Sequence, residues 1–137
     1  MADAAQSEEL VAAFEKHQAE TEIHVSRLEE VFEIIGETPK AKTCDAILGI
    51  TDEGTEIMEE YEGAPALDAG LLAAAQAVEH YEISRYGTLR TWAEKLGYDD
   101  AADLLEQTLE EEKATDAALT ELALTVVNDE AEGEDDA

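Results

Sequence analysis

The chain has 137 residues, and its 36 Asp and Glu against 8 Lys and Arg give a formal net charge of −28. This length fits one domain, and a hydrophobic fraction of 45% is much too high for a solvated polyacid, so we expect a folded chain. The charge excludes nucleic acid and anionic membranes as default partners, because their phosphates would meet a repulsive field. An acidic surface around an ordinary core is typical of proteins from a halophilic cytoplasm, where concentrated salt screens the self-repulsion.

The N-terminal sequence indicates neither export nor a membrane anchor. It has no basic segment followed by an apolar run, and no stretch reaches the roughly 18 apolar residues of a membrane span. We therefore predict a cytoplasmic protein with a leader over residues 1–7, one helical domain over 8–127 and an acidic disordered tail over 128–137. The single cysteine, Cys44, is interpreted as a small buried apolar residue.

Helix is predicted throughout the domain, because alanine, leucine and glutamate dominate the sequence and two prolines interrupt it. The predicted helices are separated by glycine-containing breaks and cover approximately residues 8–36, 43–61, 68–97 and 99–127. Ser7 is the predicted cap of the first helix, and Asp99 or Asp100 that of the fourth. The sequence therefore predicts an all-α fold with three long helices and one short helix.

In the three long helices, the inward-facing stripe is apolar at both ends and polar in the middle. We obtain each stripe by stepping alternately four and three residues along the helix. The short helix shows no such polar interruption. The polar stripe positions of the long helices are His17, Thr21, His24, Glu79, Glu82, Glu112 and Asp116.

These polar positions predict a metal site, because a buried ionised carboxylate costs on the order of several kcal/mol unless something compensates it. They fall near the middle of each helix and can therefore lie at one level of a bundle. Glu79 and Glu82 are three residues apart and Glu112 and Asp116 four apart, so each pair projects from one helix face. Carboxylates with imidazole inside a helical bundle typically bind two divalent iron or manganese ions. The predicted ligands are Glu20, His24, Glu79, Glu82, Glu112 and Asp116.

Other interpretations of the same positions stay open at this point. Any one of these glutamates could be a boundary residue of an acidic helix, and a stripe histidine could be a core residue rather than a ligand. We favour His24 over His17, because the stripe places it nearer the middle of the bundle, and Glu20 flanks both. In the run 110–112, we expect Glu112 alone to face inward. Four aromatic residues are interpreted as packing residues: Tyr86, Trp92, Tyr81 and Tyr98. For Tyr86, a hydrogen bond to a ligand carboxylate is the alternative.

From about Ser7 to Asn128 the chain resembles the YciE/YciF family of ferritin-like bacterial stress proteins. The most specific stretches are EHYEI followed by YGTL, and EEEKATD followed by LT. The resemblance implies a ferritin-like bundle, a dimer and a dinuclear metal site. The carboxylates of the family match Glu20, Glu79, Glu82 and Glu112, whereas His24 and Asp116 match less certain positions.

One departure from the family pattern concerns the N-terminus. Family members usually begin with a further helix that contains an acidic segment of the type D-x-Y-x-A-E, and this sequence starts after it. The bundle would then have an open apolar flank, which on a soluble protein normally marks an interface. We therefore expect a homo-oligomer, most simply a two-fold homodimer, in which a helix of the neighbouring chain covers the gap.

Two function classes follow. In the first, a dinuclear centre handles ferrous iron with oxygen or peroxide, as a ferroxidase or peroxide-handling oxidoreductase of the stress response, with Glu82 and Glu112 as bridging ligands. The alternative is a non-catalytic structural or interaction bundle with a degenerate, metal-free site. A hydrolase is not indicated, because the sequence contains no Ser/His/Asp or Cys/His arrangement and no Gly-rich phosphate loop.

Overall fold

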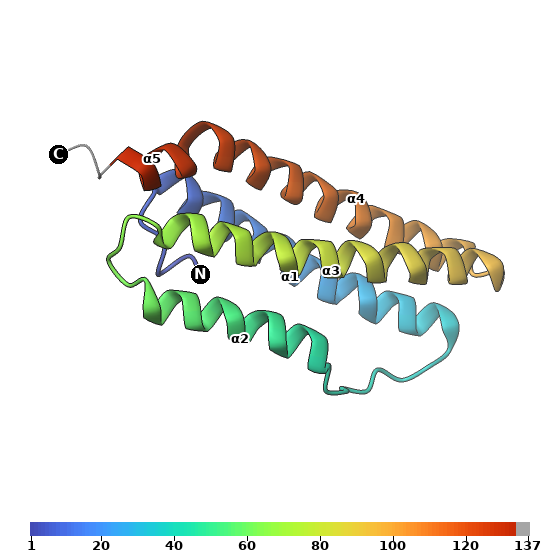
Figure 1. Cartoon of the computed structure of the whole chain (residues 1–137). Coiled ribbons are helices and arrows are strands. Elements are labelled where there is room, and N and C mark those ends of the chain that lie inside the picture. Colours follow the sequence, from blue (N-terminus) through green and yellow to red (C-terminus); the bar gives the residue numbers. More distant parts are fainter. Residues whose placement is uncertain (134–137) are drawn as a thin grey trace.

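Helices make up most of the computed structural model, which describes residues 1–133. They are α1 (Glu8–Ile35), α2 (Asp45–Glu60), α3 (Leu67–Lys95) and α4 (Asp99–Leu122), followed by a π-helical turn, η1 (Ala123–Val127), and the short α5 (Asn128–Glu132). No strand occurs within residues 1–133, which confirms the predicted all-α bundle. α4 packs on both α1 and α3, and α2 lies against α3 on the side away from α4 (Figure 1). In the described part of the chain, no helix is long and apolar enough to cross a membrane.

Glycine ends two of the long helices where the sequence predicts. Gly36 follows α1 with φ 72° and Gly97 follows α3 with φ 82°, the left-handed conformation that glycine adopts without steric cost. The start of α4 differs from the prediction, because Tyr98 occupies the N-cap position. Asp99 and Asp100 lie inside the first turn, where their charges complement the helix dipole rather than cap the helix.

The start of α1 is capped by a residue of another helix. Ser7 is at the predicted N-cap position, but its hydroxyl donates to Glu9 Oε2 at 3.0 Å instead of bonding to the backbone. Asp68, in the first turn of α3, accepts the backbone N–H groups of Gln6 at 2.8 Å and of Ser7 at 2.6 Å. A buried carboxylate distant in sequence thus satisfies donors that the helix start leaves unpaired.

The C-terminal end of the bundle extends further than predicted. The π-helical turn over 123–127 adds a residue to the helical repeat, so Val127 becomes buried where the regular stripe places Val126. Helix continues through α5 to Glu132, so the predicted disordered tail is wrong for residues 128–132. The last part of that predicted tail, residues 134–137, lies outside the described residues.

Two apolar cores occupy the two halves of the bundle and leave a polar layer between them. The first core consists of Leu10, Phe14, Leu67, Leu71, Leu72, Ala75, Leu119 and Val127. The second core consists of Ala93, Ala101, Ala102 and Leu105, with Leu28, Val31 and Tyr86 packed against it. Between them, Glu79, Glu112, His24 and Thr108 are at most 3% exposed. The alternation of apolar and polar levels predicted from the stripes is therefore present in the fold.

Some positions predicted to be internal are exposed, chiefly at the end of the bundle that α2 does not cover. Leu96 is 72% exposed and Trp92 61%, so neither packs in the core as predicted. Cys44, expected to be buried, is half-buried at the start of α2, with its Sγ 3.0 Å from the hydroxyl oxygen of Tyr81.

Candidate metal centre

Four side chains from three helices meet in the polar layer. One possible ligand atom from each of His17, Glu79, Glu82 and Glu112 lies within 4.8 Å of those of the other three. α1 supplies the imidazole, two successive turns of α3 supply Glu79 and Glu82, and α4 supplies Glu112. Their spacing along α3 places the two glutamates on one face, as the sequence predicts. We refer to these four residues as the carboxylate cluster.

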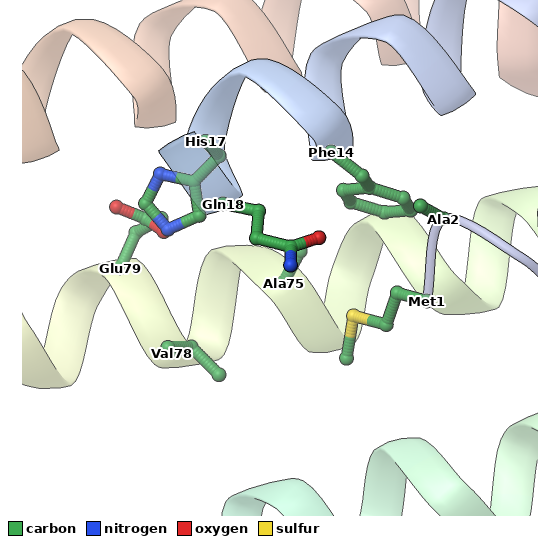
Figure 2. A pocket seen from close by; sticks show the side chains of 8 residues that line it. All are labelled: Met1, Ala2, Phe14, His17, Gln18, Ala75, Val78 and Glu79. Carbon is green, nitrogen blue, oxygen red and sulfur yellow. The ribbon is translucent and has the colours of Figure 1, made fainter. Parts of the chain in front are cut away.

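Several buried polar atoms of the carboxylate cluster have no hydrogen-bond partner. His17 Nε2 lies 2.8 Å from Glu79 Oε1, and these two residues face each other from α1 and α3 in Figure 2. Within the described chain, His17 Nδ1, Glu79 Oε2 and both carboxylate oxygens of Glu112 have no hydrogen-bond partner. Buried oxygens without donors are costly, and a divalent cation would compensate them directly. The cluster therefore fits a cation that prefers oxygen and imidazole ligands.

The environment of the cluster shifts the protonation of its side chains. Burial, together with the adjacent Glu79, raises the pKa of Glu112 to about 8. Burial and the neighbouring carboxyl of Glu112 raise the pKa of Glu82 to about 7, and Glu79 raises the pKa of His17. In the absence of a cation, protons thus take part in neutralising the cluster near neutral pH, and a bound cation would replace them.

His24 adjoins the cluster from the side of the second core. The ring is buried and contacts a glutamate at each nitrogen: Nε2 lies 2.9 Å from Glu111 Oε2, and Nδ1 lies 2.8 Å from Glu112 Oε1. The second contact has the distance of an ion pair but not the direction of a good hydrogen bond. Tyr86 meets the ring edge to face, with centroids 6.4 Å apart, and burial raises its pKa to about 12. Tyr86 therefore supports His24 by packing.

Glu111 is held by an arginine that the sequence analysis does not single out. Arg27 Nη1 lies 2.5 Å from Glu111 Oε2, and Nη2 lies 2.9 Å from Oε1, which is a bidentate pair. The guanidinium also donates to Thr108 Oγ1 at 3.2 Å. Arg27 lowers the pKa of Glu111 to about 2, so this carboxylate is charged. Glu111 is 35% exposed, in keeping with the prediction that Glu112 alone faces inward, but its contact with Arg27 was not predicted; a basic residue one turn after His24, in a chain with eight Lys and Arg, was the available signal.

Two of the predicted ligands lie outside the carboxylate cluster. Glu20 is turned toward the outer side of the α1–α4 contact, where its Oε2 accepts the Thr115 hydroxyl at 3.4 Å. Asp116 is turned toward the outer side of the α3–α4 contact, where Oδ1 lies 3.2 Å from Gln76 Nε2 and 3.1 Å from His80 Nε2. The structure thus brings together Glu79, Glu82 and Glu112, places His17 rather than His24 among them, and leaves Glu20 and Asp116 apart.

A cavity of about 200 Å³ leads to the cluster between α1, α3 and the N-terminal segment. His17 and Glu79 form its polar end, whereas Phe14, Ala75 and Val78 contribute apolar walls (Figure 2). Met1 and Ala2 complete the lining on the side of the N-terminus (Figure 2). The cluster can therefore be reached by a small molecule, although its carboxylates are buried.

Comparison with known proteins identifies the family of this chain and solved structures with the same fold. A family model described as "Domain of unknown function (DUF892)" matches residues 1–132. Protein YciF of Escherichia coli (strain K12) is 48% identical over 133 residues, which are 96% of this chain and 80% of that protein. The crystal structure of the E. coli stress protein YciF matches with a TM-score of 0.88 over 93% of this chain and 80% of that chain. YcfI from Rhodopseudomonas palustris matches with a TM-score of 0.83 at 42% identity, over 87% of this chain and 76% of its own. The chain therefore belongs to the DUF892 family and shares its helical bundle with YciF.

Proposed function

We propose that this protein binds divalent iron or manganese at the carboxylate cluster. The observation that carries the proposal is the set of buried, unpartnered oxygens of Glu79 and Glu112 beside His17 and Glu82. Three carboxylates and an imidazole suit either metal. Because a carboxylate can bridge two ions, we extend the proposal to a dinuclear centre, with Glu82 and Glu112 as the bridging ligands.

The finer proposal is that the protein handles iron or peroxide in a stress response. When bound, iron or manganese supplies one-electron chemistry toward oxygen or peroxide. The chain itself binds the cation, keeps its surroundings apolar on both sides and admits small neutral molecules through the cavity at His17 and Glu79. E. coli YciF is described as a stress protein, which supports the same role here.

The alternative is a non-catalytic bundle in which the cluster stays metal-free. The raised pKa values of Glu82 and Glu112 favour it, because protonated carboxyls can bond to one another in place of a cation. In this case the polar layer would serve stability and interaction rather than chemistry.

Metal content after purification without chelator distinguishes the two functions. We expect about two iron or manganese ions per chain, and their loss in Glu82→Ala and Glu112→Ala. Glu110→Ala is the matched control, because Glu110 lies two residues before Glu112 on α4 but is exposed and pairs with Lys113. A folded protein that takes up neither metal under any loading condition would rule out the metal-binding function.

We further propose that the protein forms a homodimer. We also propose that it works in a cytoplasm with a high salt concentration. An apolar groove of about 390 Å³ lies between the second halves of α1 and α3 and is bordered by the exposed Trp92 and Leu96. Glu37 is the one charged residue among the positions of the described chain that line it. For a chain of charge −28, this is the face on which a second copy meets little repulsion. Light scattering should therefore give the mass of a dimer, and Trp92→Glu should give that of a monomer; a wild-type monomer would exclude the dimer.

A further inference from the structure

We propose that Glu111 is a positioning residue for the metal centre: fixed by Arg27, it holds the His24 ring so that Nδ1 faces Glu112 and can serve the cluster as a further nitrogen ligand. This inference rests on the proposed metal binding. Glu111 and Arg27 both lie outside the carboxylate cluster. They would act on it through His24, because Arg27 anchors Glu111 and Glu111 holds the ring.

Arg27 holds the Glu111 carboxylate in one orientation. Both of its oxygens are bonded to the planar guanidinium of Arg27, at 2.5 and 2.9 Å, and a bidentate pair of this kind restricts rotation of the carboxylate. Arg27 is itself largely buried and tied to Thr108, whose side chain lies inside the bundle. The neighbouring Glu110 has no such restraint, since it is 59% exposed and pairs with a lysine on its own helix.

Glu111 in turn determines which ring nitrogen of His24 is free to bind a metal. An imidazole that donates its Nε2–H to a carboxylate keeps its lone pair on Nδ1. Here the distance from Nε2 to Glu111 Oε2 is 2.9 Å, and Nδ1, on the other side of the ring, lies 2.8 Å from Oε1 of Glu112. Histidine ligands in proteins commonly have this support from a carboxylate on the far nitrogen, which raises their basicity and fixes the ring.

The Arg27–Glu111 pair differs from an ordinary ion pair between helices, because Glu111 also contacts His24. Arg90 and Glu106 form another ion pair between helices, α3 and α4, through a single contact at Arg90 Nε, and the Glu106 side chain is 39% exposed against 35% for Glu111. The Arg90 pair contacts no histidine among the described residues. Removal of Glu106 therefore shows how far the loss of an ion pair between helices affects the metal site when no histidine contact is lost.

The test uses Co²⁺ as the probe, with calorimetric titration of the wild type, Glu111→Ala, Glu111→Gln and Glu106→Ala. Glu111→Ala is expected to weaken Co²⁺ binding about 10- to 100-fold, the usual loss when the partner of a ligand histidine is removed. Glu111→Gln should lose less, because its amide oxygen still accepts the Nε2–H. Glu106→Ala should bind Co²⁺ like the wild type.

A second readout follows the imidazole directly. In proton NMR of the Co²⁺-loaded wild type, a coordinated His24 gives a strongly shifted N–H signal that is absent in His24→Gln. In Glu111→Ala this signal should exchange rapidly with water, and in Glu111→Gln it should persist. Equal Co²⁺ affinities of Glu111→Ala and Glu106→Ala, or an unchanged N–H signal in Glu111→Ala, would overturn the positioning role alone. A wild type that binds no Co²⁺ would overturn the proposed metal binding and this inference with it.

Discussion

Replacing Glu112 by Gln is expected to stabilise the metal-free protein at pH 8. The side chain is fully buried, and burial beside Glu79 raises its pKa from 4.5 to about 8. Between these pH values the folded state binds a proton that the unfolded state releases, so the wild type loses stability as the pH rises through this window. At pH 8 the loss amounts to roughly 4 to 5 kcal/mol. A buried, unpartnered amide costs about 1 to 3 kcal/mol, so the net gain of Glu112→Gln is about 2 kcal/mol at pH 8. At pH 5 the wild-type loss falls below about 1 kcal/mol, because the folded carboxyl is protonated there, so the cost of the amide makes Glu112→Gln about 1 kcal/mol less stable than the wild type.

Urea unfolding with chelator at pH 5 and pH 8, in the same salt, measures this difference. A second series with excess Mn²⁺ should stabilise the wild type and leave Glu112→Gln unchanged, because the variant lacks a ligand. Glu110→Gln serves as the control and should behave as the wild type in every series. If Glu112→Gln were destabilised equally at both pH values, burial of this carboxyl would not govern the pH dependence. If Mn²⁺ stabilised the variant as much as the wild type, Glu112 would not be a ligand.

Three further predictions concern packing, a thiol and salt. A Cβ at Gly70 would lie 2.8 Å from Ile57 Cγ2, so Gly70→Ala should lower the free energy of unfolding by about 1 to 3 kcal/mol. By contrast, an alanine at Gly49 meets no atom of the described chain within 4 Å, so Gly49→Ala should raise the free energy of unfolding by up to about 1 kcal/mol. Thermal unfolding measures both variants, and equal effects would contradict the packing of α2 on α3. The Tyr81 hydroxyl lowers the pKa of the Cys44 thiol, so iodoacetamide should react more slowly with Cys44 in Tyr81→Phe; equal rates would exclude an effect of the hydroxyl. With a net charge of −28, the melting temperature should rise steeply with KCl at low ionic strength, whereas a flat response would contradict a surface adapted to salt.

The helices could be predicted from the sequence because their breaks are local. A glycine such as Gly36 ends a helix through its own backbone freedom, and no distant residue is needed to see it. The cap of α1 could not be predicted in this way, because the carboxylate that supplies it, Asp68, follows about sixty residues later. The π-helical turn at 123–127 shifts the register of the buried positions by one residue, and its sequence contains no glycine or proline from which the turn could be predicted.

The depth of the polar layer was predictable, but the choice of partners within it was less so. Stripe positions give the level of Glu79 and Glu112 in the bundle, and both are buried there. Each residue advances about 100° around a helix axis, so a position one turn away deviates by roughly 40° to 60°. For Asp116 this rotation leads to the outer side of the α3–α4 contact, whereas for Glu82 it leads into the cluster. Only the packing of neighbouring helices decides between the two outcomes. The same is true of Glu111, which lies among three consecutive glutamates and turns toward α1 because Arg27 is opposite.

The carboxylate of Asp68 joins the beginnings of α1 and α3, which are otherwise far apart in the chain. Because the same side chain holds the amides of Gln6 and Ser7, these amides can exchange with solvent only when the contact between the two helix starts opens. In native-state hydrogen exchange, both should therefore be protected to the same degree as the first turns of α3, rather than show the fraying usual at a helix end. Met1 and Ala2 of the same N-terminal segment line the cavity beside His17, so the opening of this contact would also loosen one wall of that cavity.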